Sequence, residues 1–250
     1  MNYKGSFTPL IFSLFGIFIS MDIEQLKSDI ITKGYTHFNL KDFNEEYYNE
    51  ILPFKCNETK NLKHLMTGVR IDGTPTIFDA NRIHEHSVYD SFETASKVRL
   101  DTLELIKEPF QSWYYREYNV LDFGDTIKKI KYDITRKLFS LDKSFPLKSL
   151  VTDITFFDYD CHIENHKDGS YDDRICSIIL YLNESYDVND GGILKLKNEE
   201  EVIPLFGNVA VISLEKKSAN VEHAVSKVTG GIGRYAFTTF VIYGEPTHTI

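Results

Sequence analysis

The amino-acid sequence predicts an α+β protein that is mainly β, with N-terminal helices packed against a C-terminal antiparallel β core. Three observations lead to this fold class. Helix-like patterns are confined to the first 145 residues. About eight short β-rich runs, separated by Gly, Asn and Asp turns, follow between residues 147 and 243. Aromatic residues make up 14% of the chain, with 18 Phe and 15 Tyr, which suits sheets and pockets better than helix bundles.

The N-terminal part opens with a well-marked helix over 22–33. Asp22 is the expected N-cap, Gly34 is the expected stop, and the apolar residues between them recur on one helical face. After this helix we expect a short strand at 35–39, helices at 42–52, 91–112 and 124–140, and an irregular stretch at 55–90.

The C-terminal part reads as short strands at regular spacing, which is typical of a closed or sandwiched antiparallel structure. No linker separates the two halves, so we expect one domain over 21–250, with helices and loops in 21–145 and the β core in 146–245. The expected strands are 150–159, 162–166, 175–182, 193–197, 201–204, 208–213, 222–228 and 234–243.

Charge and cysteine content exclude several classes of protein. The formal net charge is −9, so we expect no general electrostatic binding of nucleic acid. The three cysteines are odd in number and lack CxxC spacing, which argues against a disulfide scaffold or a structural zinc site. A reducing compartment, the cytoplasm, is therefore the expected location.

Residues 1–20 contain an apolar run, Leu10–Ile19, that is about ten residues long. A membrane span needs roughly 20 such residues, so no transmembrane helix is expected. The run fits a signal peptide poorly, because only Lys4 is basic and Phe18 is unsuitable near a cleavage site. We interpret 1–20 as an extension upstream of a natural start at Met21; a signal peptide, a membrane anchor and a packed segment remain alternatives.

Candidate metal ligands lie in the β core. His166 and Asp168 are two residues apart, so in an extended segment their side chains leave the same face. His223 lies in a second strand-like run, VEHAV. Two imidazoles and one carboxylate can occupy one face of an octahedral metal ion, as in non-heme Fe(II) sites. The pattern alone is weak in a chain with 8 His, so a solvated turn at 166–168 stays open.

Further polar residues surround this pattern. Arg234 follows His223 by eleven residues and opens the run RYAFTTFVIY. An arginine on a neighbouring inward-facing strand can hold a carboxylate through two parallel hydrogen bonds. Tyr181, in SIILYLN, offers a second contact, and Asp190–Gly192 predicts a tight turn before ILKL.

Six segments of the β core carry a resemblance to a known family. In chain order they are HKD, RICSIILYLN, DGGILKL, VIPLFGNVAVIS, EHAV and RYAFTTF. Together they resemble the 2-oxoglutarate- and Fe(II)-dependent dioxygenases, and within these the prolyl-hydroxylase-like branch. The resemblance covers about residues 150–243, whereas 22–140 match only loosely.

The resemblance implies a double-stranded β-helix, a jelly-roll or cupin-like barrel, packed against the N-terminal helices. It implies His166, Asp168 and His223 as iron ligands, and Arg234 and Tyr181 as contacts of the distal carboxylate of 2-oxoglutarate. The implied cofactors are Fe(II), 2-oxoglutarate and O2, with ascorbate as a candidate reductant. No separate protein acid or base is implied.

A rival pair lies in the same segment. His162 and Glu164 form an HxE pair, and simple alternation places both on the same face as His166 and Asp168. We favour the second pair because Asp168 lies 13 residues before Tyr181, close to the family's spacing, and because a glycine follows it. His162 is then expected to support the ligands or to line the pocket.

Two positions depart from the family's pattern. The tyrosine often found ten residues before the first iron histidine is Phe156 here, so we expect a polar contact to the cosubstrate to be missing. The small polar residue often found two positions after the arginine is Ala236. Both changes concern the affinity for the cosubstrate, not its identity.

The resemblance implies hydroxylation of a C–H bond, with a prolyl residue of a protein or peptide as the first candidate substrate and succinate and CO2 as products. A free amino acid or another small molecule is the alternative substrate. A catalytically silent β-helix that serves as a binding module is the non-enzymatic alternative. Nucleic-acid demethylation is disfavoured by the acidic net charge.

Overall fold

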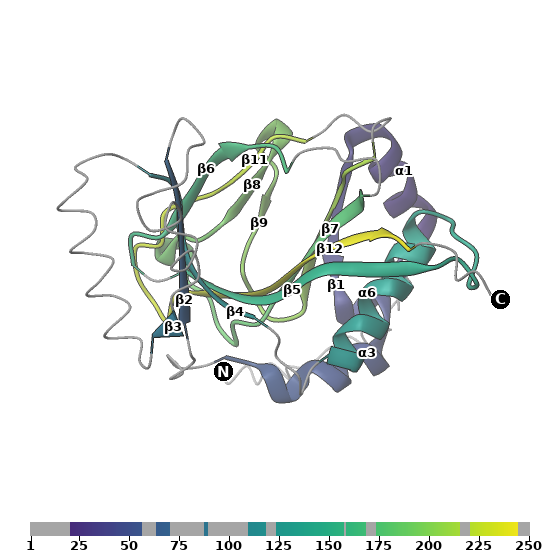
Figure 1. Cartoon of the computed structure of the whole chain (residues 1–250), viewed down its shortest axis with the longest axis horizontal. Coiled ribbons are helices and arrows are strands. Elements are labelled where there is room, and N and C mark those ends of the chain that lie inside the picture. Colours follow the sequence, from purple (N-terminus) through teal and green to yellow (C-terminus); the bar gives the residue numbers. More distant parts are fainter. Residues whose placement is uncertain are drawn as a thin grey trace, which may run out of the picture.

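The computed structural model describes residues 21–56, 64–70, 88–89, 110–118, 124–157, 159–168, 174–215 and 221–244 (Figure 1). The helices are α1 (Ile23–Lys33), α2 (Leu40–Phe43), α3 (Glu45–Ile51) and α6 (Gly124–Leu138), with short 3-10 helices η1 (Leu52–Phe54), η3 (Val188–Asp190) and η4 (Lys197–Glu199). The strands are β1 (Tyr35–Asn39), β2 (His64–Arg70), β3 (Val88–Tyr89), β4 (Phe110–Tyr118), β5 (Leu147–Phe157), β6 (His162–His166), β7 (Arg174–Tyr181), β8 (Leu194–Leu196), β9 (Glu201–Val202), β10 (Asn208–Ser213), β11 (His223–Val225) and β12 (Arg234–Tyr243).

The strands form one 12-stranded antiparallel sheet that folds over on itself and is not closed. Its order is β1-β10-β7-β12-β5-β4-β6-β11-β8-β9, and β2 and β3 are attached through β4. The turning point is β4, whose one edge pairs with β2. Along its other edge Tyr115–Tyr118 pair with β5, and Ser112 and Trp113 pair with β6. The two arms, β7-β12-β5 and β6-β11-β8, therefore face each other like the layers of a jelly roll (Figure 1).

Helix α1 forms where the capping residues predict it. The side chain of Asp22 accepts hydrogen bonds from the backbone N–H groups of Glu24 and Gln25, at 3.0 and 3.2 Å. Gly34 ends the helix in the left-handed conformation, with φ 83°, and its N–H donates to the carbonyl of Ile30. The expected helix and the strand that follows it, β1, are both confirmed.

Helix α6 covers the outer face of the β7-β12-β5 arm. Its buried side chains recur at helical spacing, and Lys131 Nζ donates to Thr239 Oγ1 on β12 at 3.1 Å. Thr135 Oγ1 lies 3.6 Å from the sulfur of Cys176 on β7, and burial raises the pKa of this thiol to about 12. Cys176 is thus a packing residue, and the inner face of the arm is left for a pocket. The buried side chains of α6 include Ile127, Ile130, Ile134 and Leu138.

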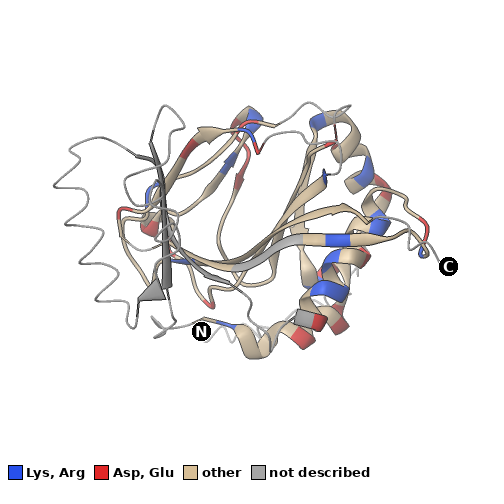
Figure 2. Ribbon diagram, in the orientation of Figure 1, with Lys and Arg blue, Asp and Glu red and all other residues tan. Residues whose placement is uncertain are grey.

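Charged residues lie mainly along the helices and at the ends of strands, and the central strands carry few of them (Figure 2). Among the helices that the structure describes, none is long and apolar enough to cross a membrane.

Three expectations for the N-terminal part differ from the structure. The stretch 55–90 is not wholly irregular, because it contains β2 and β3. The last three residues of the helix expected over 91–112 belong to a strand instead, because β4 starts at Phe110. Its aromatic run, FQSWYYREY, favours a strand. Residues 91–109 lie outside the described residues. The helix expected over 42–52 is split at Asn44, whose side chain caps α3.

Candidate metal and carboxylate site

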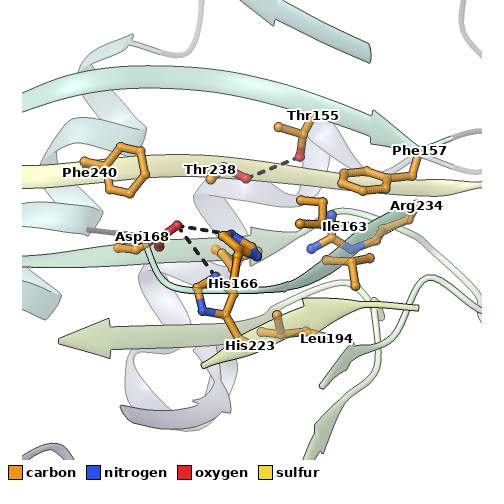
Figure 3. Close-up of a pocket in the computed structure, with 13 residues that line it drawn as sticks. Thr155, Phe157, Ile163, His166, Asp168, Leu194, His223, Arg234, Thr238 and Phe240 are labelled. Atoms are coloured by element: carbon orange, nitrogen blue, oxygen red, sulfur yellow. Dashed lines mark hydrogen bonds and ion pairs between the residues drawn. The ribbon is translucent and has the colours of Figure 1, made fainter. Parts of the chain in front are cut away.

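A pocket opens between the two arms of the sheet (Figure 3). Its volume is about 120 Å³, and most of its lining is apolar. The β7-β12-β5 arm contributes Thr155, Phe157, Ser177, Ile179, Arg234, Thr238 and Phe240, and the facing arm contributes Ile163, His166, Asp168, Leu194, His223 and Val225.

Three potential metal ligands meet in this pocket. His166 and His223 are directly paired across the ladder of β6 and β11, and Asp168 follows two residues after the end of β6. Asp168 Oδ1 lies 3.5 Å from Nε2 of His166 and 3.6 Å from Nε2 of His223. Cis ligands of an octahedral ion lie about 3 Å apart when the bonds are about 2.1 Å long. The three side chains therefore fit a single divalent ion after a small inward movement.

The backbone orients both imidazole rings. Nδ1 of His166 lies 2.9 Å from the carbonyl oxygen of Glu164, and Nδ1 of His223 lies 3.1 Å from that of Val221. A carbonyl oxygen only accepts, so each Nδ1 carries the proton and donates it. In the neutral rings the lone pair is then on Nε2, beside Asp168. Metal-binding histidines are held in the same way, with one nitrogen donating to a carbonyl and the other facing the metal.

The charge states of Asp168 and His223 suit a metal site. Burial opposes the imidazolium of His166, but the hydrogen bond and the attraction of Asp168 outweigh it and raise the pKa. Burial lowers the pKa of His223. Burial also opposes the carboxylate of Asp168, yet the hydrogen bond to His166 and the charges of His223, His166 and Arg174 lower its pKa. Asp168 is therefore ionised and His223 neutral near pH 7, whereas His166 holds its proton more firmly and would release it on metal binding.

A β-bulge in β6 decides which of its side chains face the pocket. Val225 pairs with Ile163 and His223 pairs with His166, so β6 has one residue more than β11 between these pairs. The bulge breaks the alternation, and both Ile163 and His166 line the pocket. The simple alternation expected over 162–168 is wrong for this reason.

The rival pair, His162 and Glu164, lies outside the pocket lining. His162 Nε2 is 3.6 Å from Glu164 Oε1, and His162 Nδ1 is 3.1 Å from the carbonyl oxygen of Asp160. The side chain of Glu164 is 60% exposed. This placement favours His166 and Asp168 as the ligand pair.

Arg234 is a buried cation in the same pocket, at the end beside Phe157 (Figure 3). It is 3% exposed, and its guanidinium carbon lies 4.5 Å from the ring centre of Phe157 and 5.0 Å from that of Tyr181. One terminal nitrogen donates to the Tyr181 hydroxyl at 3.4 Å. No acidic residue in the described ranges forms an ion pair with Arg234, and its Nε has no hydrogen-bond partner there.

A buried guanidinium without a carboxylate partner is costly, so this end of the pocket suits an anionic ligand such as a carboxylate. Tyr181 is fully buried and is not among the residues that line the pocket, so it contacts Arg234 from behind. Burial raises the pKa of Tyr181 although Arg234 acts in the opposite sense. The hydroxyl therefore stays protonated.

Residues 152–242, which hold all of these side chains, match the family model of the 2OG-Fe(II) oxygenase superfamily. The β core of this chain therefore resembles that superfamily in sequence over residues 152–242. No curated protein matches the sequence significantly. The expected family is thereby confirmed for the β core.

Two solved structures of 2OG-Fe(II) oxygenases share the fold. One is a prolyl hydroxylase from Trichoplax adhaerens in complex with a hypoxia inducible factor oxygen degradation domain peptide fragment. It is 13% identical, the match covers 88% of this chain and 89% of that one, and the TM-score is 0.54. The other is an oxidoreductase of the 2OG-Fe(II) oxygenase family from Burkholderia pseudomallei, with 12% identity, coverages of 89% and 91% and a TM-score of 0.51. The expected jelly-roll fold is confirmed.

The structure places Phe156, one of the two departures from the family's pattern, outside the pocket. Phe156 does not line the pocket, because it is 2% exposed and its ring stacks on Tyr235 at a centroid distance of 4.4 Å. Its neighbours Thr155 and Phe157 face the pocket instead. Thr155 Oγ1 lies 3.2 Å from Thr238 Oγ1, so two hydroxyl groups missed in the sequence lie in the same pocket as the triad (Figure 3). The signal for Thr238 was its place four residues after Arg234 on one strand face.

The glycine turn before β8 lets the chain approach Arg234. Gly191 and Gly192 both have φ 70°, so the expected tight turn is present. A Cβ on Gly191 would collide with the carbonyl oxygen of Lys227, and one on Gly192 would lie 3.1 Å from Cβ of Arg234. Gly192 thus packs directly on the stem of the arginine.

We expect Gly192→Ala to destabilise the protein and to weaken 2-oxoglutarate binding several-fold. The left-handed backbone costs an alanine about 1–2 kcal/mol, and the new methyl group pushes on the stem of Arg234. Thermal unfolding and the KM for 2-oxoglutarate check the two effects. Gly34→Ala is the control, because Gly34 has φ 83° at the end of α1. It should lower stability and leave the KM unchanged; equal KM changes in both variants would contradict the role of Gly192.

Proposed function

We propose that the chain is an Fe(II)- and 2-oxoglutarate-dependent dioxygenase that hydroxylates a C–H bond, with a prolyl residue of a protein or peptide as its substrate. One observation carries the reaction class. His166, Asp168 and His223 share one pocket with Arg234, a buried cation for which the described residues supply no carboxylate. A divalent ion and a dicarboxylate anion are the two ligands that such a pocket fits.

Each side chain has a separate task in this proposal. His166, Asp168 and His223 would hold Fe(II) by one face, so that three positions remain for other ligands. Arg234 would pair with the distal carboxylate of 2-oxoglutarate, and Tyr181 would hold the guanidinium in place. When bound, iron would activate O2, the oxidant; 2-oxoglutarate would supply two electrons and leave as succinate and CO2, with one oxygen atom of O2 entering succinate and the other entering the substrate.

The remaining lining residues exclude water and orient ligands. Ile163, Val225 and Leu194 surround the triad on its own arm, and Ile179 faces them from β7. An apolar wall strengthens the attraction between Arg234 and a carboxylate by lowering the local dielectric constant. No proton transfer is assigned to a side chain.

The substrate class rests on the resemblance of the β core to the prolyl-hydroxylase-like branch. The fold shared with the Trichoplax enzyme, which was solved with a peptide, agrees with this choice. A free amino acid or another small molecule is the competing substrate class.

The test is in two stages. Anaerobic titration of the protein with Fe(II) and then 2-oxoglutarate should give the weak visible charge-transfer band of the chelate, and Asp168→Ala should abolish it. With O2, and ascorbate as reductant, the protein should then form succinate and add one oxygen atom to proline-containing peptides, as detected by mass spectrometry. Hydroxylation of free proline or lysine alone would contradict the peptide substrate. Chelation without any turnover would indicate a silent binding module.

A further inference from the structure

Asp168 is the one triad residue that the sheet does not hold. His166 and His223 are paired with each other in the ladder, so backbone hydrogen bonds between β6 and β11 set their separation. Asp168 lies beyond the end of β6 and belongs to no strand. Its carboxylate is nevertheless 13% exposed and lies within 3.6 Å of both imidazoles. Some other contact must restrain its backbone.

That contact comes from Arg174, the first residue of β7. Its terminal nitrogen Nη1 donates to the backbone carbonyl oxygen of Asp168 at 2.8 Å. Its guanidinium carbon lies 4.6 Å from the ring centre of Phe240, which lines the pocket on β12. The guanidinium therefore connects the backbone of Asp168 to the wall of the pocket.

A second bulge directs Arg174 to this place. Cys176 pairs with Val241 on β12, but Arg174 pairs with Ile242, so β7 has one residue more than β12 between the two pairs. Cys176 faces α6 on the outer side of the arm. Because of the extra residue, Arg174 instead shares a face with Phe240, two residues from Ile242. Bulges are used in this way to aim a side chain at a site.

We propose that Arg174 is a positioning residue that fixes the backbone of Asp168 against the pocket wall and so sets the affinity of the triad for a divalent metal ion. The proposal rests on the function proposed above. Groups that orient metal ligands without touching the metal typically change metal affinity 10–100-fold when they are removed.

The test measures Mn2+ affinity of the full chain by electron paramagnetic resonance of the free ion. Arg174→Met keeps an apolar stem against Phe240 and removes the donor, so we expect affinity to fall 10–100-fold. Arg174→Lys keeps a charged donor and should bind within about fivefold of the unsubstituted chain. Higher Mn2+ affinity in Arg174→Lys than in Arg174→Met would show that the hydrogen-bond donor matters. If the loss came only from packing, the two variants would bind Mn2+ equally.

Arg136 on α6 offers a matched control. Its Nη2 donates to the backbone carbonyl of Phe145 at 3.3 Å, and its guanidinium carbon lies 5.8 Å from the ring centre of Tyr132. Arg136 does not line the pocket. Arg136→Met should therefore cost a similar amount of thermal stability and leave Mn2+ affinity unchanged.

The outcomes distinguish this inference from the proposed function. If Asp168→Ala binds Mn2+ as well as the unsubstituted chain, the triad is not the metal site and the proposed function fails. If binding depends on Asp168 but Arg174→Met binds equally well, only the role of Arg174 fails. Should Arg174→Met not fold, Arg174→Lys and Arg174→Gln replace it in the comparison. Equal affinities of these two variants would overturn the inference, and at least tenfold weaker binding by the Gln variant would support it.

Discussion

Replacing His166, Asp168 or His223 by alanine should each abolish 2-oxoglutarate turnover, with a loss of at least 10²-fold. Removing a group that only orients a metal ligand already lowers metal affinity or activity 10–100-fold, and removing the ligand itself should lower it further. The fold should persist, because these side chains meet in a pocket and not in the core between α6 and the sheet. Succinate formation measures turnover, circular dichroism checks the fold, and Fe(II) titration shows whether the loss arises at the metal.

His162→Ala is the matched control for this prediction. His162 is also a histidine of β6 with Nδ1 against a backbone carbonyl, but it does not line the pocket. Its removal should change turnover by less than about threefold. If His162→Ala abolished iron binding and His166→Ala did not, the ligand pair would be His162 and Glu164 instead.

The strands of the β core could be predicted closely because their pattern is local. The strands expected at 162–166, 208–213 and 234–243 coincide with β6, β10 and β12. Alternation, β-branched residues and glycine turns are all visible within a few residues of each strand. β2 escaped prediction because it exists through pairing with a distant segment, as between Gly68 and Trp113. Tertiary pairing of this kind leaves little trace in local periodicity. β4 was missed although its aromatic run favours a strand, because the helix expected over 91–112 extended across its first residues.

In the candidate site, too, local features could be predicted from the sequence and features that depend on strand pairing could not. The four residues singled out in the sequence, His166, Asp168, His223 and Arg234, line one pocket. The sequence pattern did not show which side chains of β6 face the pocket. That depends on a bulge, and bulges arise from the register between strands, not from composition. The bulge in β6 separates His162 from the triad face.

Arg234→Ala should raise the KM for 2-oxoglutarate tenfold or more, equivalent to about 1.5–3 kcal/mol for a lost charged hydrogen bond. The reason is that the described part of the pocket holds Arg234 without a carboxylate partner, so the ligand's distal carboxylate is the expected one. The low dielectric constant around a side chain that is 3% exposed strengthens this pair. Metal affinity should stay unchanged in the absence of 2-oxoglutarate, because Arg234 is not among the clustered ligands.

Tyr181→Phe should give a smaller effect of the same kind, because it removes one hydrogen bond of 3.4 Å to the guanidinium and leaves the charge in place. We expect the KM to rise by less than the tenfold of Arg234→Ala, since a neutral hydrogen bond contributes about 1 kcal/mol.

An unchanged KM for 2-oxoglutarate in Arg234→Ala would mean that the distal carboxylate binds elsewhere. Lys195 and Lys197 would then be tested next, although both are exposed and Lys195 lies 3.7 Å from a carboxylate oxygen of Glu201. Such surface cations bind a dicarboxylate weakly, because water and salt screen them. We therefore expect a tight complex with 2-oxoglutarate to depend on the buried arginine.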